Sequence, residues 1–163
     1  MNRGEGMRTT MEDGVAMKMH RVAIQRIAQT APEFIDITDE VAAAVEASGI
    51  QDGTVTVFSR HTTAAVKINE NEPLLLRDMA RFLETSAPRE AEYRHNDFVI
   101  RTANMTDDEC PNGHSHCQHL MLSASETIPV MGGRLALGRW QSVFLVELDR
   151  PREREVVIQV LGL

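Results

Sequence analysis

Residues 127–137 read TIPVMGGRLAL, in which two short apolar segments are separated by Gly132-Gly133. A Gly-Gly pair in this position is typical of a tight β-hairpin, because glycine reaches the positive φ angles that such a turn needs. The sequence around the hairpin has the same character, with short strand-like runs at His119–Ser123, Ser142–Leu148 and Glu155–Leu161. The C-terminal part of the chain is therefore predicted to form antiparallel strands.

The N-terminal part predicts four more strands and two helices. Alternating or β-branched residues indicate strands at residues 21–27, 33–37, 53–59 and 64–69. Thr38 is expected to cap a first helix that stops at Gly49. Pro73 is expected to lie in the first turn of a second helix, which carries an apolar stripe.

Strands thus outnumber helices, and no βαβ rhythm repeats along the chain. This pattern predicts an α+β fold of mainly antiparallel, β-sandwich-like sheets with two helices. Residues 1–18 contain four methionines and three glycines with almost no hydrophobic pattern, so we expect a flexible N-terminal leader. Residues 19–163 are expected to form a single domain.

The composition excludes several classes of protein. The formal net charge is −7, which argues against a general nucleic-acid binder, because such proteins need a basic surface. No apolar run approaches the roughly 20 residues of a membrane helix, and no signal peptide is recognisable. Cys110 and Cys117 are too few for a disulfide framework. These features predict a cytoplasmic protein without a membrane or nucleic-acid partner, while a basic pocket for a phosphorylated small molecule remains open.

Three of the six histidines lie in the segment NGHSHCQH at residues 112–119. If that segment is extended, the side chains of His114 and His116 point to the same face. Two imidazoles on one face, with a third from elsewhere, could hold a divalent metal such as zinc, while nearby carboxylates would shift the preference toward a harder ion such as magnesium. A solvated histidine loop is the alternative. The segment belongs to a polar stretch at residues 86–118, and a loop of that length is often functional.

Two further blocks carry polar side chains in unusual density. Residues 59–71 contain His61 together with Asn69 and Asn71, which would share one face of a continued strand; a strand end with turn-forming amides is the alternative. Residues 138–154 contain Trp140 and Gln141, and then Glu147 within an apolar strand. A carboxylate there must be paired or close to a metal if it faces inward.

The last block also alternates Arg150, Arg152 and Arg154. An extended backbone would present the three guanidinium groups on one face, where they could hold phosphate through bidentate hydrogen bonds. A solvated edge of a sheet is the equally good alternative.

Together these blocks resemble the YjbQ family, also called UPF0047. The matching segments are His61-Thr-Thr-Ala-Ala65, Asn69-Glu-Asn71, Tyr93-Arg-His95, Ser115-His116, Gly133–Gly138, Trp140-Gln141 and Glu147 with the arginine-rich terminal strand. The resemblance runs from about His20 to the C-terminus. Arg139, Ser123 and Arg150 depart from residues that are common in the family, which puts the substrate in doubt more than the fold.

The resemblance implies a homotrimer with a secondary thiamine-phosphate synthase activity. That reaction joins an aminopyrimidine methyl diphosphate to a thiazole phosphate and releases diphosphate. The resemblance also assigns His61, His95 and His116 to a metal or catalytic cluster.

The leading hypothesis is a small metal-assisted enzyme that acts on a phosphorylated small molecule. We expect His61 and Glu147 to be catalytic. The residues expected to contact substrate are Asn69, Asn71, Trp140, Gln141, Arg152 and Arg154. The alternatives are a non-catalytic trimer that binds a metal or a metabolite, and a purely structural trimer.

Overall fold

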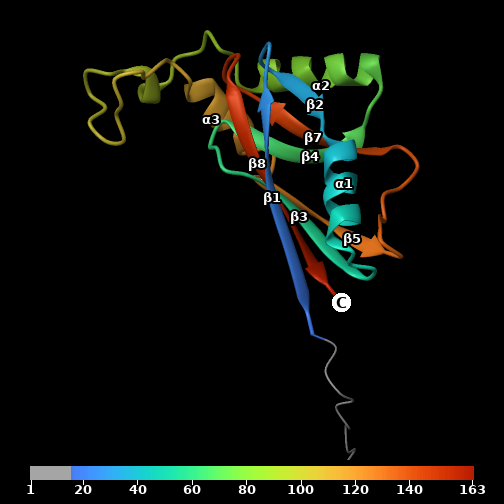
Figure 1. The fold of residues 1–163 in the computed structure, drawn as a ribbon. Helices are drawn as coiled ribbons and strands as arrows, with labels where there is room; N and C mark the ends of the chain where they lie inside the picture. The colour runs from blue at the N-terminus through green and yellow to red at the C-terminus, as the bar shows by residue number, and fades with distance from the viewer. Residues whose placement is uncertain (1–15) are drawn as a thin grey trace, which may run out of the picture.

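The computed structural model describes residues 16–163, which form two antiparallel sheets and the helices that pack beside them (Figure 1). The elements in chain order are β1 Lys18–Ile27, β2 Glu33–Asp36, α1 Thr38–Ser48, β3 Gly53–Ser59, β4 Ala64–Glu70, α2 Pro73–Ser86, the short 3₁₀ helix η1 Arg94–Asn96, α3 Gly113–His119, β5 Ser125–Met131, β6 Arg134–Leu135, β7 Gln141–Glu147 and β8 Glu153–Gly162. The predicted α+β class with antiparallel sheets is confirmed.

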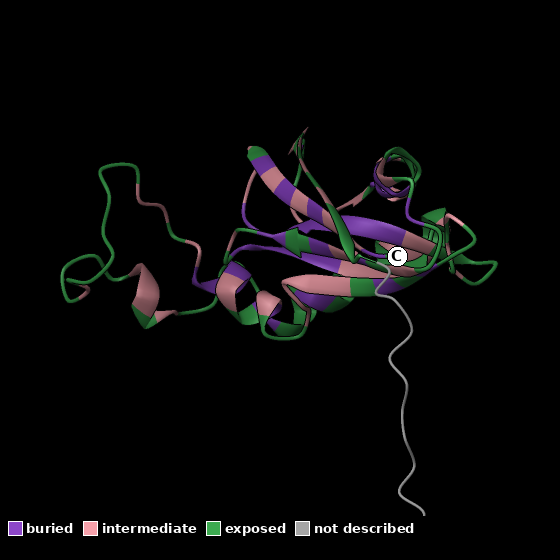
Figure 2. Ribbon diagram, turned by 60° about the horizontal axis from the view of Figure 1, so that its bottom comes forward, coloured by how far each residue is buried: buried purple, intermediate pink, exposed green. Residues whose placement is uncertain are grey.

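The larger sheet has the strand order β1-β8-β3-β5-β6, and the smaller sheet has the order β2-β7-β4. Every pairing in both sheets is antiparallel. Gly132 and Gly133 have positive φ angles and form the turn between β5 and β6, as their pairing in the sequence predicts. Along β8, buried residues alternate with partly buried ones (Figure 2).

The main core lies between the inner faces of the two sheets and is closed by α1. Its residues include Val55, Val66, Leu145 and Ile158, all fully buried. A second core lies on the other face of the smaller sheet, where α2 packs with Leu83 against β7. Since β7 is covered on both faces, its residues from Val143 to Val146 are all buried, which explains the unbroken apolar run in the sequence.

Three expectations about local structure are wrong. Thr38 is the first residue of α1 rather than its cap; its hydroxyl donates to Asp36 and accepts the backbone N–H of Val143. Residues 113–119, which lie mostly in the stretch expected to be an irregular polar loop, form α3, so the described chain has three α-helices instead of two. The strand predicted at residues 119–123 is a turn, in which Ser123 alone makes a bridge to Val66.

The helix α3 escaped prediction because its buried face is polar. His114, Ser115 and Gln118 all point inward. The Gln118 amide donates to the carbonyl oxygens of Leu83 and Ala87 at the end of α2, at 3.2 and 3.1 Å. Hydrogen bonds rather than an apolar stripe therefore anchor this helix, and hydrophobic periodicity cannot reveal it.

Of the predicted leader, residues 1–15 lie outside the described residues, and β1 already begins at Lys18. No helix in the described part of the chain is long and apolar enough to cross a membrane.

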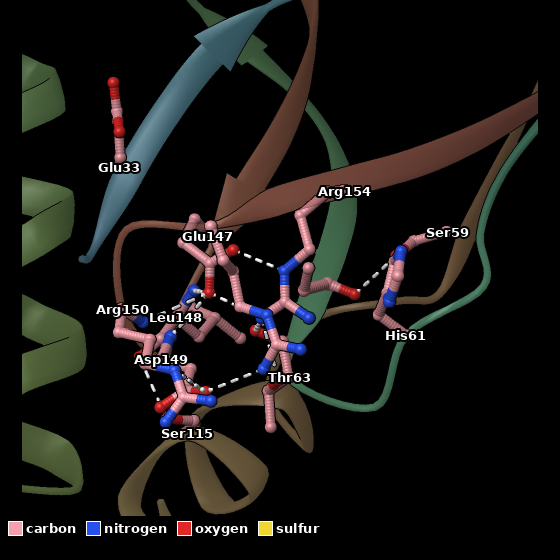
Figure 3. A network of polar contacts seen from close by, with 12 residues as sticks. Glu33, Ser59, His61, Thr63, Ser115, Glu147, Leu148, Asp149, Arg150 and Arg154 are labelled. Atoms are coloured by element: carbon pink, nitrogen blue, oxygen red, sulfur yellow. Dashed lines mark hydrogen bonds and ion pairs between the residues drawn. The ribbon is translucent and has the colours of Figure 1, made fainter. Parts of the chain in front are cut away.

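The crossing from β7 to β8 links the two sheets through a buried ion pair. Glu147 ends β7 and Arg154 lies at the start of β8, and both side chains are almost completely buried. The Arg154 guanidinium donates from Nε and Nη2 to the two carboxylate oxygens, and Nη2 also reaches Thr63 Oγ1 at 2.9 Å (Figure 3). Glu147 Oε1 additionally accepts the backbone N–H groups of Leu148 and Asp149. Side chains and backbone thus fix this turn.

Replacing Arg154 with Met leaves the Glu147 carboxylate buried and unpaired, so we expect a loss of about 3–5 kcal/mol in the free energy of unfolding. The double variant Glu147→Leu/Arg154→Met removes both charges and should recover most of that loss. Urea unfolding measures both. Arg81→Met is the matched control, because Arg81 pairs with Asp78 at the exposed surface, and it should change stability little. Equal stability of the Arg154→Met variant and the wild type would contradict the interpretation.

Candidate functional site

A polar cavity of about 490 Å³ lies where the loop between β3 and β4, α3 and the start of β8 meet. It is lined by three histidines and four arginines, which are His61, His95, His116, Arg60, Arg101, Arg152 and Arg154. Glu109 is the one carboxylate among its lining residues in the described chain. We call it the histidine–arginine cavity.

The three histidines reach the cavity from separate elements. His61 lies in the loop between β3 and β4, His95 in η1, and His116 on α3. The rings of His95 and His116 meet edge to face, with their centroids 4.7 Å apart. The histidines that the family resemblance singled out therefore gather around one cavity.

His61 has a defined hydrogen bond. Its Nε2 accepts the backbone N–H of Glu155 at 3.0 Å. A backbone N–H can meet only the lone pair of a ring nitrogen, so the neutral ring carries its proton on Nδ1. Burial first, and then the positive charges of Arg154 and Arg152, lower the pKa of His61 below its ordinary value of 6.5. At pH 7 His61 is therefore a neutral imidazole with an Nδ1–H to donate.

His114 and His116 differ because they lie two residues apart on a helix, about 200° around its axis. His116 lines the cavity, and burial, followed by the nearby His95, lowers its pKa. His114 is buried behind it, with Nε2 3.1 Å from the Ser115 hydroxyl. The two side chains therefore do not point to the same face, as they would in an extended segment.

The arginines are held by carboxylates that lie around the cavity. Arg101 pairs with Glu109 at 2.7 Å, and Arg152 lies 3.4 Å from the buried Asp149. Arg154 reaches the wall through Thr63 and Glu147, as described above. These partners fix the guanidinium groups, and four arginines against the single lining carboxylate of Glu109 make the cavity suited to an anion such as phosphate.

The predicted arginine triplet is only partly realised. Arg150 and Arg152 precede β8 and are about one third exposed, at 36% and 38%, whereas Arg154 turns inward to Glu147. The three guanidinium groups therefore do not share one face. Arg152 and Arg154 nevertheless both line the cavity.

The three histidines do not form a ready metal site in this arrangement. Within residues 16–163, no group of three or more His, Cys, Asp or Glu side chains is placed to hold a metal ion. The Nε2 lone pair of His61 is already used by Glu155. The zinc or magnesium ion expected on His61, His95 and His116 stays a prediction, and no step below depends on it.

Glu147 does not line the cavity. Its carboxylate lies behind Arg154, where Arg154 and backbone amides occupy its oxygens (Figure 3). This geometry gives it a supporting position and no access to a bound molecule. The inward-facing carboxylate is paired, as its place in an apolar strand required.

The remaining predicted substrate residues lie at the other end of the smaller sheet. β4 pairs with β7 so that Ala64 is opposite Glu147, while Glu70 is opposite Gln141. Six residues of strand, about 20 Å, separate these two pairs. Within one chain, the end that carries Asn69, Asn71, Trp140 and Gln141 is therefore remote from the histidines.

These four residues make local contacts. Asn69 donates to the sulfur of Met79, while Asn71 donates to Asp36 at 2.7 Å, so the two amides have different partners. Gln141 accepts the backbone N–H of Gly138, and Trp140 is 62% exposed beneath the guanidinium of Arg139.

The sequence did not single out several residues of the cavity. Arg101, Asn104, Glu109 and Asn112 belong to the connection between α2 and α3. The length and polarity of that connection marked it as functional, but nothing in its spacing identified these side chains. The Oδ1 of Asn112 is buried and has no hydrogen-bond partner among the described residues.

Comparisons with known proteins give a consistent picture. Residues 23–163 match the model of the family described as UPF0047 protein YjbQ-like. The UPF0047 protein of Methanothermobacter thermautotrophicus is 40% identical over 152 residues, covering 93% of this chain and 99% of its own. The UPF0047 protein YugU of Bacillus subtilis is 36% identical, covering 80% of this chain and 90% of its own.

Solved structures agree with this assignment. A protein of unknown function from Sulfolobus solfataricus, described as YbjQ-like, superposes with a TM-score of 0.79 at 34% identity, covering 91% of this chain and all of its own. A hypothetical protein of Aeropyrum pernix gives a TM-score of 0.78 at 33% identity, covering 88% and 98%. By sequence and by structure, the chain belongs to the YjbQ-like UPF0047 family.

Proposed function

We propose that the histidine–arginine cavity binds the phosphate or diphosphate group of a small metabolite and that the protein is an enzyme acting on that molecule. One observation carries the proposal. Three histidines and the arginines around them, which come from distant parts of the chain, line one cavity of about 490 Å³. Such a set of donors matches the oxygens of a phosphate group.

Each part of the cavity has a distinct task in this proposal. Arg101 and Arg152 donate to phosphate oxygens, because their carboxylate partners hold them at the wall. His61 donates from Nδ1, since its Nε2 accepts from Glu155. The adjacent rings of His95 and His116 carry a proton to or from the reacting group. Arg154 fixes this wall through its hydrogen bonds to Thr63.

The family resemblance suggests the thiamine-phosphate synthase reaction as a side activity. In that reaction the bond between the methylene carbon and the diphosphate oxygen breaks, and its electron pair leaves with diphosphate. The ring nitrogen of the thiazole phosphate then bonds to that carbon. Within the cavity, the arginines would hold the departing diphosphate and a histidine would protonate it. The expected homotrimer and cytoplasmic location belong to this proposal as well.

The predicted zinc or magnesium ion has no step in this proposal and is tested separately. Metal content is measured by elemental analysis of the untagged protein and of the His116→Ala variant. If the wild type contains stoichiometric metal and the variant does not, the ion binds in the cavity.

A non-catalytic, trimeric metabolite-binding protein is the second candidate. The position of Glu147 favours it, because the carboxylate expected to take part in catalysis lies outside the cavity. Saturable binding of diphosphate esters without any product would support this candidate over an enzyme.

Binding of inorganic diphosphate tests whether the cavity recognises the diphosphate group. We expect Arg152→Gln to weaken its binding by roughly 10-fold or more, because a charged hydrogen bond to the anion is lost. Calorimetric titration of the full chain measures the affinity. Arg139→Gln is the matched control, since Arg139 stacks on Trp140 and does not line the cavity, and it should leave the affinity unchanged. Equal affinities for wild type and Arg152→Gln would count against the proposal.

The binding of sulfate should strengthen as the pH falls. Sulfate keeps its charge between pH 8 and pH 5, so the histidines dominate the change. The pKa of His116 is lowered in the free protein, and a bound anion raises it, whereas Nε2 of His61 is held by the Glu155 N–H and is not free to take up a proton. Affinity is therefore expected to rise below about pH 7, by up to about tenfold per pH unit for each proton taken up.

Titrations at several pH values measure this dependence. The His116→Asn variant should flatten it, whereas His20→Asn, in β1 and outside the cavity, should not. An affinity that is constant from pH 8 to pH 5.5 would show that the histidines do not face the anion.

A further inference from the structure

A second cavity adjoins the histidine–arginine cavity and has a different chemical character. Its volume is about 650 Å³, and its walls include Phe58 of β3, Cys117 and Leu120 at the end of α3, and Ala124. These residues form its apolar side, and the polar residues Ser59, Arg60, His61, Thr62, His116 and His119 line the rest. We call it the apolar cavity.

The two cavities share a wall. Arg60, His61, Thr62 and His116 line both of them. A molecule whose phosphate group lies among the arginines can therefore extend past His61 and His116 into the apolar cavity. Each of the two volumes lies within the range of small-molecule sites, roughly 300–1,000 Å³.

We infer that the two cavities form one composite site for the phosphate monoester of an apolar alcohol, an aryl or alkyl phosphate. This inference rests on the proposed function, which supplies the phosphate group. The ester oxygen would lie near the shared wall. The alkyl or aryl group of the ester, which we call its apolar body, would cover Phe58 and Leu120. Both side chains are exposed in the free protein, at 42% and 84%, so a ligand has apolar surface to remove from water.

The apolar walls also discriminate against polar bodies. The hydroxyl groups of a sugar or glycerol phosphate lose hydrogen bonds to water there, and Phe58, Leu120 and Ala124 return none from their side chains.

Two monoesters of equal charge test the inference on the full-length protein. We expect phenyl phosphate to bind about tenfold or more tightly than glycerol phosphate, because only its body buries apolar surface. Isothermal titration calorimetry gives both affinities, and inorganic phosphate serves as the reference for the shared group.

Two variants locate the apolar body. Leu120→Ser and Phe58→Thr alter partly exposed side chains, so the fold should tolerate them, and Thr keeps a β-branched residue in β3. Each should remove most of the preference for phenyl phosphate and leave inorganic phosphate binding unchanged. The matched control Leu74→Ser alters an exposed leucine of α2 that lines neither cavity, and it should change neither affinity.

The outcomes separate this inference from the proposed function. Equal binding of phenyl and glycerol phosphate would overturn the composite site but leave phosphate binding intact. A preference that survives both variants would overturn the placement of the body. Failure of all three phosphates to bind would overturn the inference and the proposed function together. A preference that is lost in Leu120→Ser and Phe58→Thr alone supports the composite site.

Discussion

The ion pair of Glu147 and Arg154 is the constraint on which the site depends. It lies where the chain leaves the smaller sheet and enters the larger one, so it fixes how β7 and β8 meet. The same guanidinium binds Thr63, two residues from His61. A buried pair adds little net stability over an apolar pair, but removing one partner is costly. Its physical effect is therefore to hold one geometry, and that geometry places a wall of the cavity.

The electrostatic design of the cavity follows from this arrangement. The arginines at its wall are held by carboxylates, as Arg101 is held by Glu109, which also lines the cavity, and Arg152 by the buried Asp149. Burial first, and then nearby positive charge, lower the pKa of His61 and of His116, which favours their neutral form. The neutral ring of His116 can take up a proton when an anion binds beside it. Anion binding and proton uptake are therefore coupled by the positions of the groups.

Sequence patterns predicted the strands well, because alternation reports directly which face of a strand is buried. They also predicted that Glu147 would be paired if it faced inward, and it is. They failed at α3, since Gln118 and Ser115 anchor it through hydrogen bonds to backbone carbonyls. Arg101 and Glu109 could not be found either. Their pairing depends on how a long connection folds, and no periodicity describes that.

The polar motifs lie at two opposite ends of the β4–β7 pair. Their spacing in the sequence therefore does not tell which of them share a site. Asn69 lies only eight residues after His61, yet the extended backbone of β4 carries it to the opposite end of the sheet. His116 is much further away in sequence and lies at the same cavity as His61, because α3 packs beside the start of β4. In an antiparallel sheet, residues that are far apart in sequence come together where neighbouring strands end at the same edge of the sheet. The functional grouping therefore follows from the register of β4 with β7 and from the polar anchoring of α3.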